Sequence, residues 1–422
     1  MTSETSKSDK GEFITFTPHS MANGGKAVGR DQGNRTIFVP LAIPGETIRV
    51  QISESRARFA QGNIIEIITP SPDRVAPRCP HFGSCGVCHF QHIAYEAQLR
   101  YKRLVVQDQL KRIGKLENVL VREVIPSPEP WNYSLEALFH TTPAGQLGYW
   151  FTSTNGVTII QECHIIKSEL LEAYQQTDLE LPSLNSLALR LGEEGDLLAA
   201  LVIMDEETPS LATDLPLSAN VILPDGTTLN LIGDNHTVHD VKGRTFRFVA
   251  SSYIYPSLAA TQQLIDTVLE KANLTEGERV VELYCGSGLL TAFIASLVRI
   301  VEGIEANSDA IGDLAANLDH LDNVVIYQGE AGEILPGLQK SPDLLVLSPP
   351  SEGLEPHELD LIAYLEPFRI IYISRDVATL ARDAHRFAQK GFSLLEVQPI
   401  DMWPQTYHTL TVSSMKAKRT VS

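Results

Sequence analysis

The sequence predicts an α/β protein. Its C-terminal part is expected to be a Rossmann-like, doubly wound parallel sheet, preceded by a small OB-type β-barrel and a mixed α+β domain. Two observations predict this class. From about residue 245, strand-like and helix-like segments alternate, as in sheets whose parallel strands are joined by helices. Residues 11–70 instead contain short runs of alternating apolar and polar residues, separated by glycine-containing turns.

The length of 422 residues is enough for two or three domains, each with its own core. We expect a disordered tail at 1–10, an OB-type domain at 11–70, a central domain at 71–240 and the parallel-sheet domain at 245–422. The chain has no apolar run long enough to span a bilayer, and its first residues are polar. We therefore expect a cytoplasmic monomer with no membrane partner.

Charge is distributed unevenly along the chain. The formal net charge is −18, yet residues 1–115 contain 16 Lys and Arg against 10 Asp and Glu. A basic first third joined to an acidic body is typical of an appended module that binds a polyanion, although a solvated fluctuation in charge would look the same. OB-type barrels commonly bind single-stranded nucleic acid. The candidate phosphate contacts in this part are Lys26, Arg30, Arg35, Arg56 and Arg58.

A basic amphipathic helix is predicted from Ala94 to Ile113. Its polar faces are expected to carry the basic residues Arg100, Lys102, Arg103, Lys111 and Arg112.

Three of the five cysteines lie within ten residues, in the segment CPHFGSCGVCHFQH. In a reducing compartment this spacing favours a metal site over disulfides. Cys79, Cys85 and Cys88 need a fourth ligand, and Cys163 is the obvious candidate. Four thiolates suit a [4Fe–4S] cluster or structural zinc. We favour the iron–sulfur cluster, because zinc sites more often show two CxxC pairs.

The most informative stretch is VVELYCGSGLLTAFIASLVRIVEGIE, residues 280–305. A buried strand leads into Glu282 and the loop Gly286-Ser287-Gly288, and a second strand ends at Glu305. Glycines let a backbone approach a nucleoside-like ligand, and an acid at the end of the second strand can accept both ribose hydroxyls. A Gly-x-Gly loop fits S-adenosylmethionine better than a dinucleotide.

These segments resemble one family along nearly the whole chain. That family is the RNA (uracil-5-)-methyltransferases, class I S-adenosylmethionine-dependent enzymes with an N-terminal TRAM domain and a [4Fe–4S] cluster. The resemblance rests on IPGETIRV (43–50), SPDRVAPRCPHFGSCGVCHFQH (71–92), Cys163, VVELYCGSG (280–288), GIEAN (303–307), YISRDVATLARD (372–383) and DMWPQTYH (401–408). It implies that the four cysteines bind the cluster and that the partner is RNA, either rRNA or tRNA. The cofactor residues it implies are Glu282, Tyr284, Gly286, Gly288, Glu305 and, on the adenine side, Glu330.

The family's chemistry needs residues that this chain lacks. In the family, a cysteine thiolate adds to C6 of uracil, C5 then attacks the methyl group, and a carboxylate removes the C5 proton. Here Arg375 replaces the cysteine and Leu410 replaces the glutamate. Ser348 replaces the aspartate of an Asp-Pro-Pro-Arg segment, and residues 253–257 read YIYPS where the family has Phe-Phe-Gln-x-Asn.

Arginine has no accessible nucleophilic form, because its guanidinium stays protonated. We therefore expect absent or very weak methylation of uracil C5. Cys285 is expected to pack rather than react, because the family carries it in the cofactor loop beside a separate nucleophile. Asp376 and His408 are candidate bases for a different transfer, or structural residues.

Three functions are compatible with this pattern. The first is an RNA methyltransferase that does not use the thiol route and acts on an oxygen or nitrogen atom. The second is a non-catalytic RNA-binding pseudoenzyme whose cofactor pocket is vestigial or regulatory. The third, a factor acting on proteins, is supported only by the acidic body.

Overall fold

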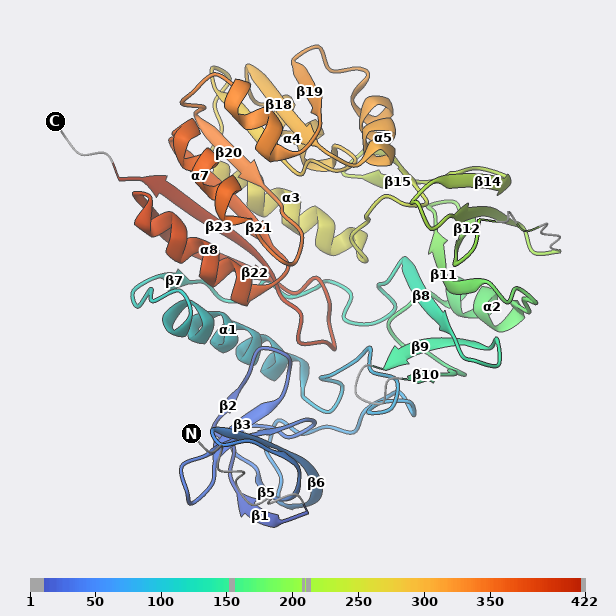
Figure 1. Cartoon of the computed structure of the whole chain (residues 1–422), viewed down its shortest axis with the longest axis vertical. Helices are drawn as coiled ribbons and strands as arrows, with labels where there is room; N and C mark the ends of the chain where they lie inside the picture. Colours follow the sequence, from blue (N-terminus) through green and yellow to red (C-terminus); the bar gives the residue numbers. More distant parts are fainter. Residues whose placement is uncertain (1–10, 152–155, 207–208, 210–213, 419–422) are drawn as a thin grey trace, which may run out of the picture.

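The computed structural model describes residues 11–151, 156–206, 209 and 214–418. The expected tail at 1–10 lies outside this range. A small β domain at one end is followed along the chain by a second sheet and then by a large α/β domain at the other end (Figure 1). The predicted α/β class with an all-β N-terminal domain is confirmed.

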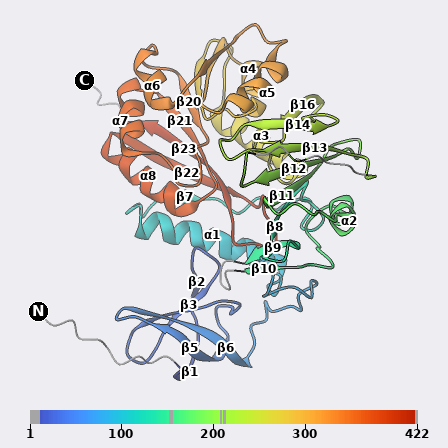
Figure 2. The same ribbon diagram turned by 45° about the vertical axis from the view of Figure 1, so that its right-hand side comes forward.

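The N-terminal domain is a six-stranded sheet of order β1-β5-β6-β4-β3-β2. Alternate residues of its strands face a core that contains Ile37, Ile48 and Val50, as the period of two requires. Figure 2 shows the domain standing apart from the larger body, below helix α1. The strands are β1 (Phe13–Phe16), β2 (Ser20–Met21), β3 (Ala27–Arg30), β4 (Thr36–Val39), β5 (Thr47–Ser55) and β6 (Phe59–Thr69).

The central part is built on a seven-stranded sheet of order β10-β9-β8-β11-β12-β13-β14. Helix α2 (Ser168–Gln176) packs on it through Leu170 and Tyr174. A separate hairpin, β15 (His236–Val241) and β16 (Arg244–Val249), leads towards the last domain. The sheet strands are β8 (Glu136–Thr141), β9 (Leu147–Phe151), β10 (Gly156–Thr158), β11 (Leu184–Leu191), β12 (Leu197–Ile203), β13 (Leu217–Ile222) and β14 (Thr228–Ile232).

The C-terminal domain is an eight-stranded sheet of order β19-β18-β17-β20-β21-β23-β22-β7. The strands are β17 (Arg279–Leu283), β18 (Ile300–Glu305), β19 (Val324–Gln328), β20 (Leu344–Leu347), β21 (Arg369–Ser374), β22 (Phe392–Ile400), β23 (Leu410–Ala417) and the short β7 (Leu120–Val121). Strands β17 to β21 are parallel, and β23 runs antiparallel to both of its neighbours. The helices are α3 (Leu258–Ala272), α4 (Leu289–Ala295), α5 (Ser308–Leu318), α6 (Ala331–Ile334), the 3₁₀ turn η1 (Leu335–Gly337), α7 (Pro356–Leu365) and α8 (Val377–Gln389).

The strand order reverses around β17. The chain continues from β17 to β18 on one side and later returns to β20 on the other side. In open α/β sheets, ligands bind at the carboxyl ends of the strands beside such a reversal. The Gly286 loop, which follows β17, lies at this position.

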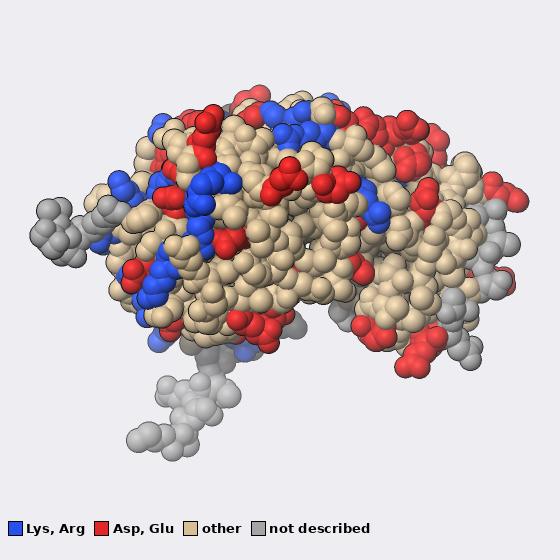
Figure 3. Space-filling model, turned by 90° about the horizontal axis from the view of Figure 1, so that it is seen from above, with Lys and Arg blue, Asp and Glu red and all other residues tan. Residues whose placement is uncertain are grey.

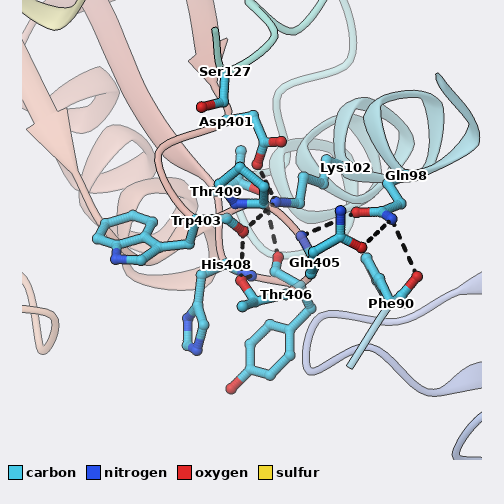
Figure 4. A network of polar contacts seen from close by, with 12 residues as sticks. Phe90, Gln98, Lys102, Ser127, Asp401, Trp403, Gln405, Thr406, His408 and Thr409 are labelled. Carbon is cyan, nitrogen blue, oxygen red and sulfur yellow. Dashed lines mark hydrogen bonds and ion pairs between the residues drawn. The ribbon is translucent and has the colours of Figure 1, made fainter. Parts of the chain in front are cut away.

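Helix α1 (Tyr95–Arg112) corrects one expectation. Its existence and bounds agree with the prediction, but Lys102 does not lie on a polar face: its side chain is fully buried and paired with the buried Asp401. Figure 4 shows this pair between α1 and the loop that joins β22 to β23. The physical reason is that α1 packs on α8 and on the C-terminal sheet. Strand β7, which follows α1, pairs with β22 of the same sheet.

Figure 3 looks onto the end of the molecule opposite the N-terminal domain. Acidic side chains are spread over this face, and the basic ones form a few small groups between them. The candidate phosphate contacts lie in the N-terminal domain at the other end. Within the described residues, no helix is both long enough and apolar enough to cross a membrane.

Candidate active site

The loop after β17 makes a tight turn that only certain residues tolerate. Gly286 and Gly288 have positive φ angles of 57° and 81°, a region that glycine enters without strain. A Cβ at Gly288 would come within 3.0 Å of Leu318. Tyr284 also has a positive φ, of 59°, and its hydroxyl donates a 2.6 Å hydrogen bond to Glu358 of α7. The loop therefore packs closely against α5 at Gly288 and is hydrogen-bonded to α7 through Tyr284.

Glu305 lies directly beside this loop, because Leu283 and Ile304 are partners on adjacent strands. Its carboxylate accepts hydrogen bonds from the backbone N–H of Gly286 at 2.8 Å and of Asn307 at 2.9 Å. Asn307 in turn caps helix α5. Glu305 is thus held in place by the glycine loop, the segment with which it was expected to form the nucleoside site.

Glu282 points from β17 into the same region and is only 3% exposed. Burial raises its pKa to about 7, an effect that the 2.7 Å hydrogen bond from Thr291 opposes and the Glu305 carboxylate reinforces. A carboxyl group with this pKa exchanges a proton near neutral pH. Thr291 could not be singled out from the sequence, because a threonine inside an apolar helix carries no distinctive signal.

A cavity of about 360 Å³ opens at this edge of the sheet. Its walls contain Glu282, Tyr284, Gly286 and Glu305 of the expected cofactor set, together with Asn307. Gly288 lies just behind the loop as the N-cap of α4. Glu330 is an exposed N-cap residue of α6, after β19, and does not line this cavity.

The substrate-side departures converge on the other end of the same cavity. Arg375 follows β21, Ser348 follows β20, and Tyr253 and Tyr255 come from the segment before α3. The Arg375 guanidinium lies over the Tyr253 ring, with Cζ 4.6 Å from the ring centroid. Tyr255 is half-buried and lines the cavity together with Ser348. The sequence showed these four positions as departures but did not predict that they form one wall.

The three expected positions Asp376, His408 and Leu410, which concern catalysis, also lie outside the cavity. Asp376 caps α8, accepting hydrogen bonds from the N–H groups of Ala378 and Thr379. His408 is exposed to solvent and packs against Tyr407. Leu410 is completely buried, in the same hydrophobic core as Cys285.

Among the described residues, Cys285 is the one thiol in the walls of this cavity. It is 7% exposed and packs in the core between β17 and the helices that cover it. Burial, with further contributions from Glu282 and Glu305, raises its pKa well above the ordinary value. The group is therefore a neutral thiol, which is a weak nucleophile.

The four other cysteines line one small cavity of about 20 Å³, together with Tyr149 and His81. The cysteine loop is pinned by backbone bonds, including Cys85 N–H to the His81 carbonyl at 2.9 Å. Gly86 has a positive φ and no room for a side chain beside Phe151. Cys163 arrives from the central sheet and is hydrogen-bonded to Tyr149.

These thiols fit a group that several thiolates share. Burial, reinforced by mutual repulsion with Cys163 and Cys79, raises the pKa of Cys85 to about 12. A positively charged metal centre would reverse that effect, because it stabilises thiolates. In the part of the chain that the structure describes, no three His, Cys, Asp or Glu side chains are placed to hold a single ion.

Two family models match this chain. The TRAM domain matches residues 13–65, and tRNA (Uracil-5-)-methyltransferase matches residues 228–415. An uncharacterized RNA methyltransferase of Halalkalibacterium halodurans is 30% identical, over 99% of this chain and 100% of its own length. Another uncharacterized RNA methyltransferase, from Thermosynechococcus vestitus, is also 30% identical, over 96% of this chain and 98% of its own length.

A solved structure shares the fold. The tRNA (uracil-54, C5)-methyltransferase of Pyrococcus abyssi, in complex with S-adenosyl-L-homocysteine, superposes with a TM-score of 0.70 at 20% identity. The match covers 95% of this chain and 100% of that one. The resemblance stated from the sequence is thereby confirmed. The chain belongs to the family of RNA methyltransferases in which a TRAM domain precedes a tRNA (uracil-5-)-methyltransferase domain.

Proposed function

We propose that this protein binds RNA and S-adenosylmethionine and does not methylate uracil C5 by thiol addition. The observation that carries the proposal is the contrast between the two ends of one cavity. At one end, Glu305 and the Gly286 loop keep a nucleoside-binding arrangement. At the other end lies Arg375, at the position where the sequence resemblance places the family's nucleophile.

Each residue at the cofactor end has an assigned role in this proposal. Glu305 accepts the ribose hydroxyls, and the loop at Gly286 and Gly288 lets the backbone approach. Glu330 lies outside the cavity and is assigned to the adenine side only by the sequence resemblance. Glu282 provides a carboxylate near the cationic part of the ligand. When bound, S-adenosylmethionine supplies an electrophilic methyl group.

Thiol catalysis needs a thiolate and a base from the protein, and the residues expected to supply them are replaced here. Uracil C5 becomes nucleophilic only after a thiolate has added to C6, and Arg375 cannot supply one. Cys285 does not substitute for it, since its buried thiol stays protonated. The proton at C5 would need a base at position 410, where the structure has a leucine inside the core.

Calorimetry with S-adenosylmethionine tests the cofactor half of the proposal. We expect binding by the wild type and at least a tenfold weaker affinity for Glu305→Ala. Glu330→Ala is expected to weaken binding less, because the side chain lies outside the cavity. Asp322→Ala, at an exposed turn, is the matched control and should not change the affinity. Absence of binding by the wild type would contradict this half.

Mass spectrometry of nucleosides from RNA incubated with the protein and the cofactor separates the remaining functions. A methylated nucleoside other than 5-methyluridine would identify a methyltransferase acting on an oxygen or nitrogen atom. No methylation, together with retained RNA binding, would identify the non-catalytic alternative. That alternative is favoured by one observation: neither Asp376 nor His408 reaches the cavity as a replacement base.

For the cysteine site we propose a [4Fe–4S] cluster bound by Cys79, Cys85, Cys88 and Cys163. Its support is that all four thiols line one small cavity. Anaerobically purified protein should be brown and contain iron and sulfide, and Cys88→Ser should lose both. Cys285→Ala is the control that keeps them. Colourless protein with stoichiometric zinc would contradict the cluster.

A further inference from the structure

Within the part of the chain that the structure describes, no carboxylate pairs with the partly buried Arg375. Arg244 has no carboxylate partner there either, but its guanidinium donates a hydrogen bond to the Ala292 carbonyl. Arg190 pairs with Glu136 at 2.6 Å, and Arg247 pairs with Asp313 at 3.1 Å. Among the described residues, the guanidinium of Arg375 lies over the ring of Tyr253. A guanidinium in a cavity wall with no fixed counter-charge is available to an anionic ligand.

The neighbouring hydroxyl groups have the right chemistry to complete an anion site. A tyrosine hydroxyl is protonated at neutral pH, so the hydroxyls of Tyr253 and Tyr255, which both line the cavity, can donate hydrogen bonds. Ser348 adds a third hydroxyl beside Tyr255. Three neutral donors around one guanidinium match the oxygens of a carboxylate or phosphate group.

The rings hold the guanidinium in position. Tyr253 and Tyr255 pack edge to face, with ring centroids 5.2 Å apart, and Arg375 lies over the face of Tyr253. Stacking of this kind orients the planar guanidinium and costs it little hydration. Tyr253 remains half exposed, so this end of the cavity is open to an incoming ligand.

The order of the strands places this group away from the nucleoside end. Glu305, the Gly286 loop, Ser348 and Arg375 follow β18, β17, β20 and β21, which are successive neighbours in the sheet. At about 4.8 Å per strand spacing, β21 lies roughly 14 Å from β18. A ligand whose nucleoside occupies the Glu305 end therefore has Arg375 within reach of its charged groups. The same end of the cavity is also accessible to an anionic group of a second substrate.

We infer that Arg375, Tyr253, Tyr255 and Ser348 form an oxyanion-binding subsite in the cofactor cavity. Its ligand is a carboxylate or phosphate group. Two sources offer this chemistry, namely the amino-acid carboxylate of the cofactor and a phosphate of the RNA. The inference rests on the proposed function for the cofactor source and is independent of it for the phosphate source.

Four probes in two matched pairs distinguish the sources. S-adenosylhomocysteine carries the carboxylate, and 5′-methylthioadenosine lacks it. Uridine 5′-monophosphate carries a phosphate, and uridine lacks it. Calorimetry on the wild type and on Arg375→Met, with Arg299→Met as an exposed arginine control outside the cavity, gives an affinity for each probe.

We expect Arg375→Met to weaken binding of at least one oxyanion-bearing probe by about 10- to 100-fold, the range for a charged hydrogen bond. Binding of that probe's uncharged partner and all affinities of Arg299→Met should stay as in the wild type. Tyr253→Phe, which keeps the ring, should weaken the same probe about three- to tenfold. Thermal unfolding checks that the variants fold. Should Arg375→Met not fold, Tyr253→Phe and Arg375→Lys carry the test.

The outcomes separate this inference from the proposed function. If Arg375→Met changes no affinity, or weakens both members of each pair equally, the subsite is wrong although cofactor binding stands. If the wild type binds neither thioadenosine probe but binds the monophosphate through Arg375, the cofactor proposal fails and the subsite stands. If none of the four probes binds to the wild type, both are wrong.

Discussion

At the scale of single residues, the cavity is defined by side chains whose surroundings change their chemistry. Glu282 is a buried carboxyl with a raised pKa, and Cys285 is a buried thiol that stays protonated. Arg375 is a cation that no carboxylate among the described residues neutralises. Each of these states follows from burial and neighbours rather than from the residue type alone. The chemistry open to the protein is therefore decided by position.

Glu282 gives a pH-dependent stability. Its pKa of about 7 in the folded protein exceeds the ordinary 4.5 of an unfolded chain, so between these values the folded state keeps a proton that the unfolded state has released. Stability from this group is complete below pH 4.5 and is lost as the pH rises through 7. Glu282→Gln should remove that loss and stabilise the protein relative to the wild type by up to about 3 kcal/mol at pH 8.

Urea unfolding of both proteins from pH 5.5 to 8 measures this difference. The gap between the two free energies of unfolding should widen with pH, whereas an exposed carboxyl variant such as Asp322→Asn should show a small and constant gap. A constant gap for Glu282→Gln would contradict the raised pKa.

Leu410 stands where the resemblance places the family's catalytic glutamate, and its surroundings are apolar. Its side chain is fully buried beside Met402 and Val412. Leu410→Glu should therefore lower the free energy of unfolding by roughly 3–5 kcal/mol, the cost of an unpaired charge in a core. Leu410→Met, which conserves volume and polarity, should cost less than about 1.5 kcal/mol. Equal stabilities of the two variants in chemical denaturation would show that a carboxylate finds solvent or a partner there.

At the scale of elements, the loop between β22 and β23 is attached to two other segments. Lys102 of α1 pairs with Asp401 (Figure 4). Asp401 also accepts a 2.8 Å hydrogen bond from Tyr95. The Gln405 carbonyl accepts hydrogen bonds from the N–H groups of His89 and Phe90, which come directly after the cysteine loop. The cysteine site, α1 and the end of the sheet are thus linked by one polar network.

The buried pair in this network gives a double-variant prediction. Lys102→Met leaves the Asp401 carboxylate buried without its cation and should destabilise the protein by roughly 3–5 kcal/mol. Replacing both partners, as in Lys102→Met with Asp401→Leu, should cost less than the single change, because no uncompensated charge remains. Chemical denaturation of the two single variants and the double variant tests this. Additive losses would mean that the two groups act independently.

The parts of the site that lie within one short segment could be predicted from the sequence, whereas those built from distant segments could not. The Gly286 loop, Glu305 and the cysteine spacing are visible because each lies within one short segment. The wall of Tyr253, Ser348 and Arg375 was not visible, because three separate segments must fold before they meet. The burial of Lys102 escaped for the same reason: its partner is 299 residues away.

At the scale of the whole molecule, charge and domains are segregated. The chain has a net charge of −18, whereas its basic first third includes the TRAM domain, at the end opposite the mixed-charge face of Figure 3. Within that domain Arg35 is paired with Asp31 and Arg56 with Glu54, so these two arginines are partly neutralised. Arg58 is exposed and is the better candidate for a phosphate contact.

RNA binding should therefore depend on salt and on the TRAM domain. Arg58→Ala is expected to weaken RNA binding similarly across sequences and to reduce the slope of log affinity against log salt concentration by about 1. Lys340→Ala, an exposed change in the C-terminal domain, is the control and should leave the slope unchanged. Fluorescence anisotropy over a range of salt concentrations provides the measurement. Equal slopes for wild type and Arg58→Ala would remove Arg58 from the interface.

With the cofactor bound, the proposed cavity holds a methyl donor but no thiolate that could activate a pyrimidine. Incubation of the protein with a 5-fluorouridine-containing RNA and S-adenosylmethionine, followed by denaturing electrophoresis, tests this claim directly. Enzymes that use thiol addition are trapped as covalent adducts on such RNA, because the fluorine at C5 cannot be removed as a proton. We predict no adduct with the wild type. A covalent RNA–protein band that survives denaturation would show that another group of this protein attacks the ring, and would contradict the proposed chemistry.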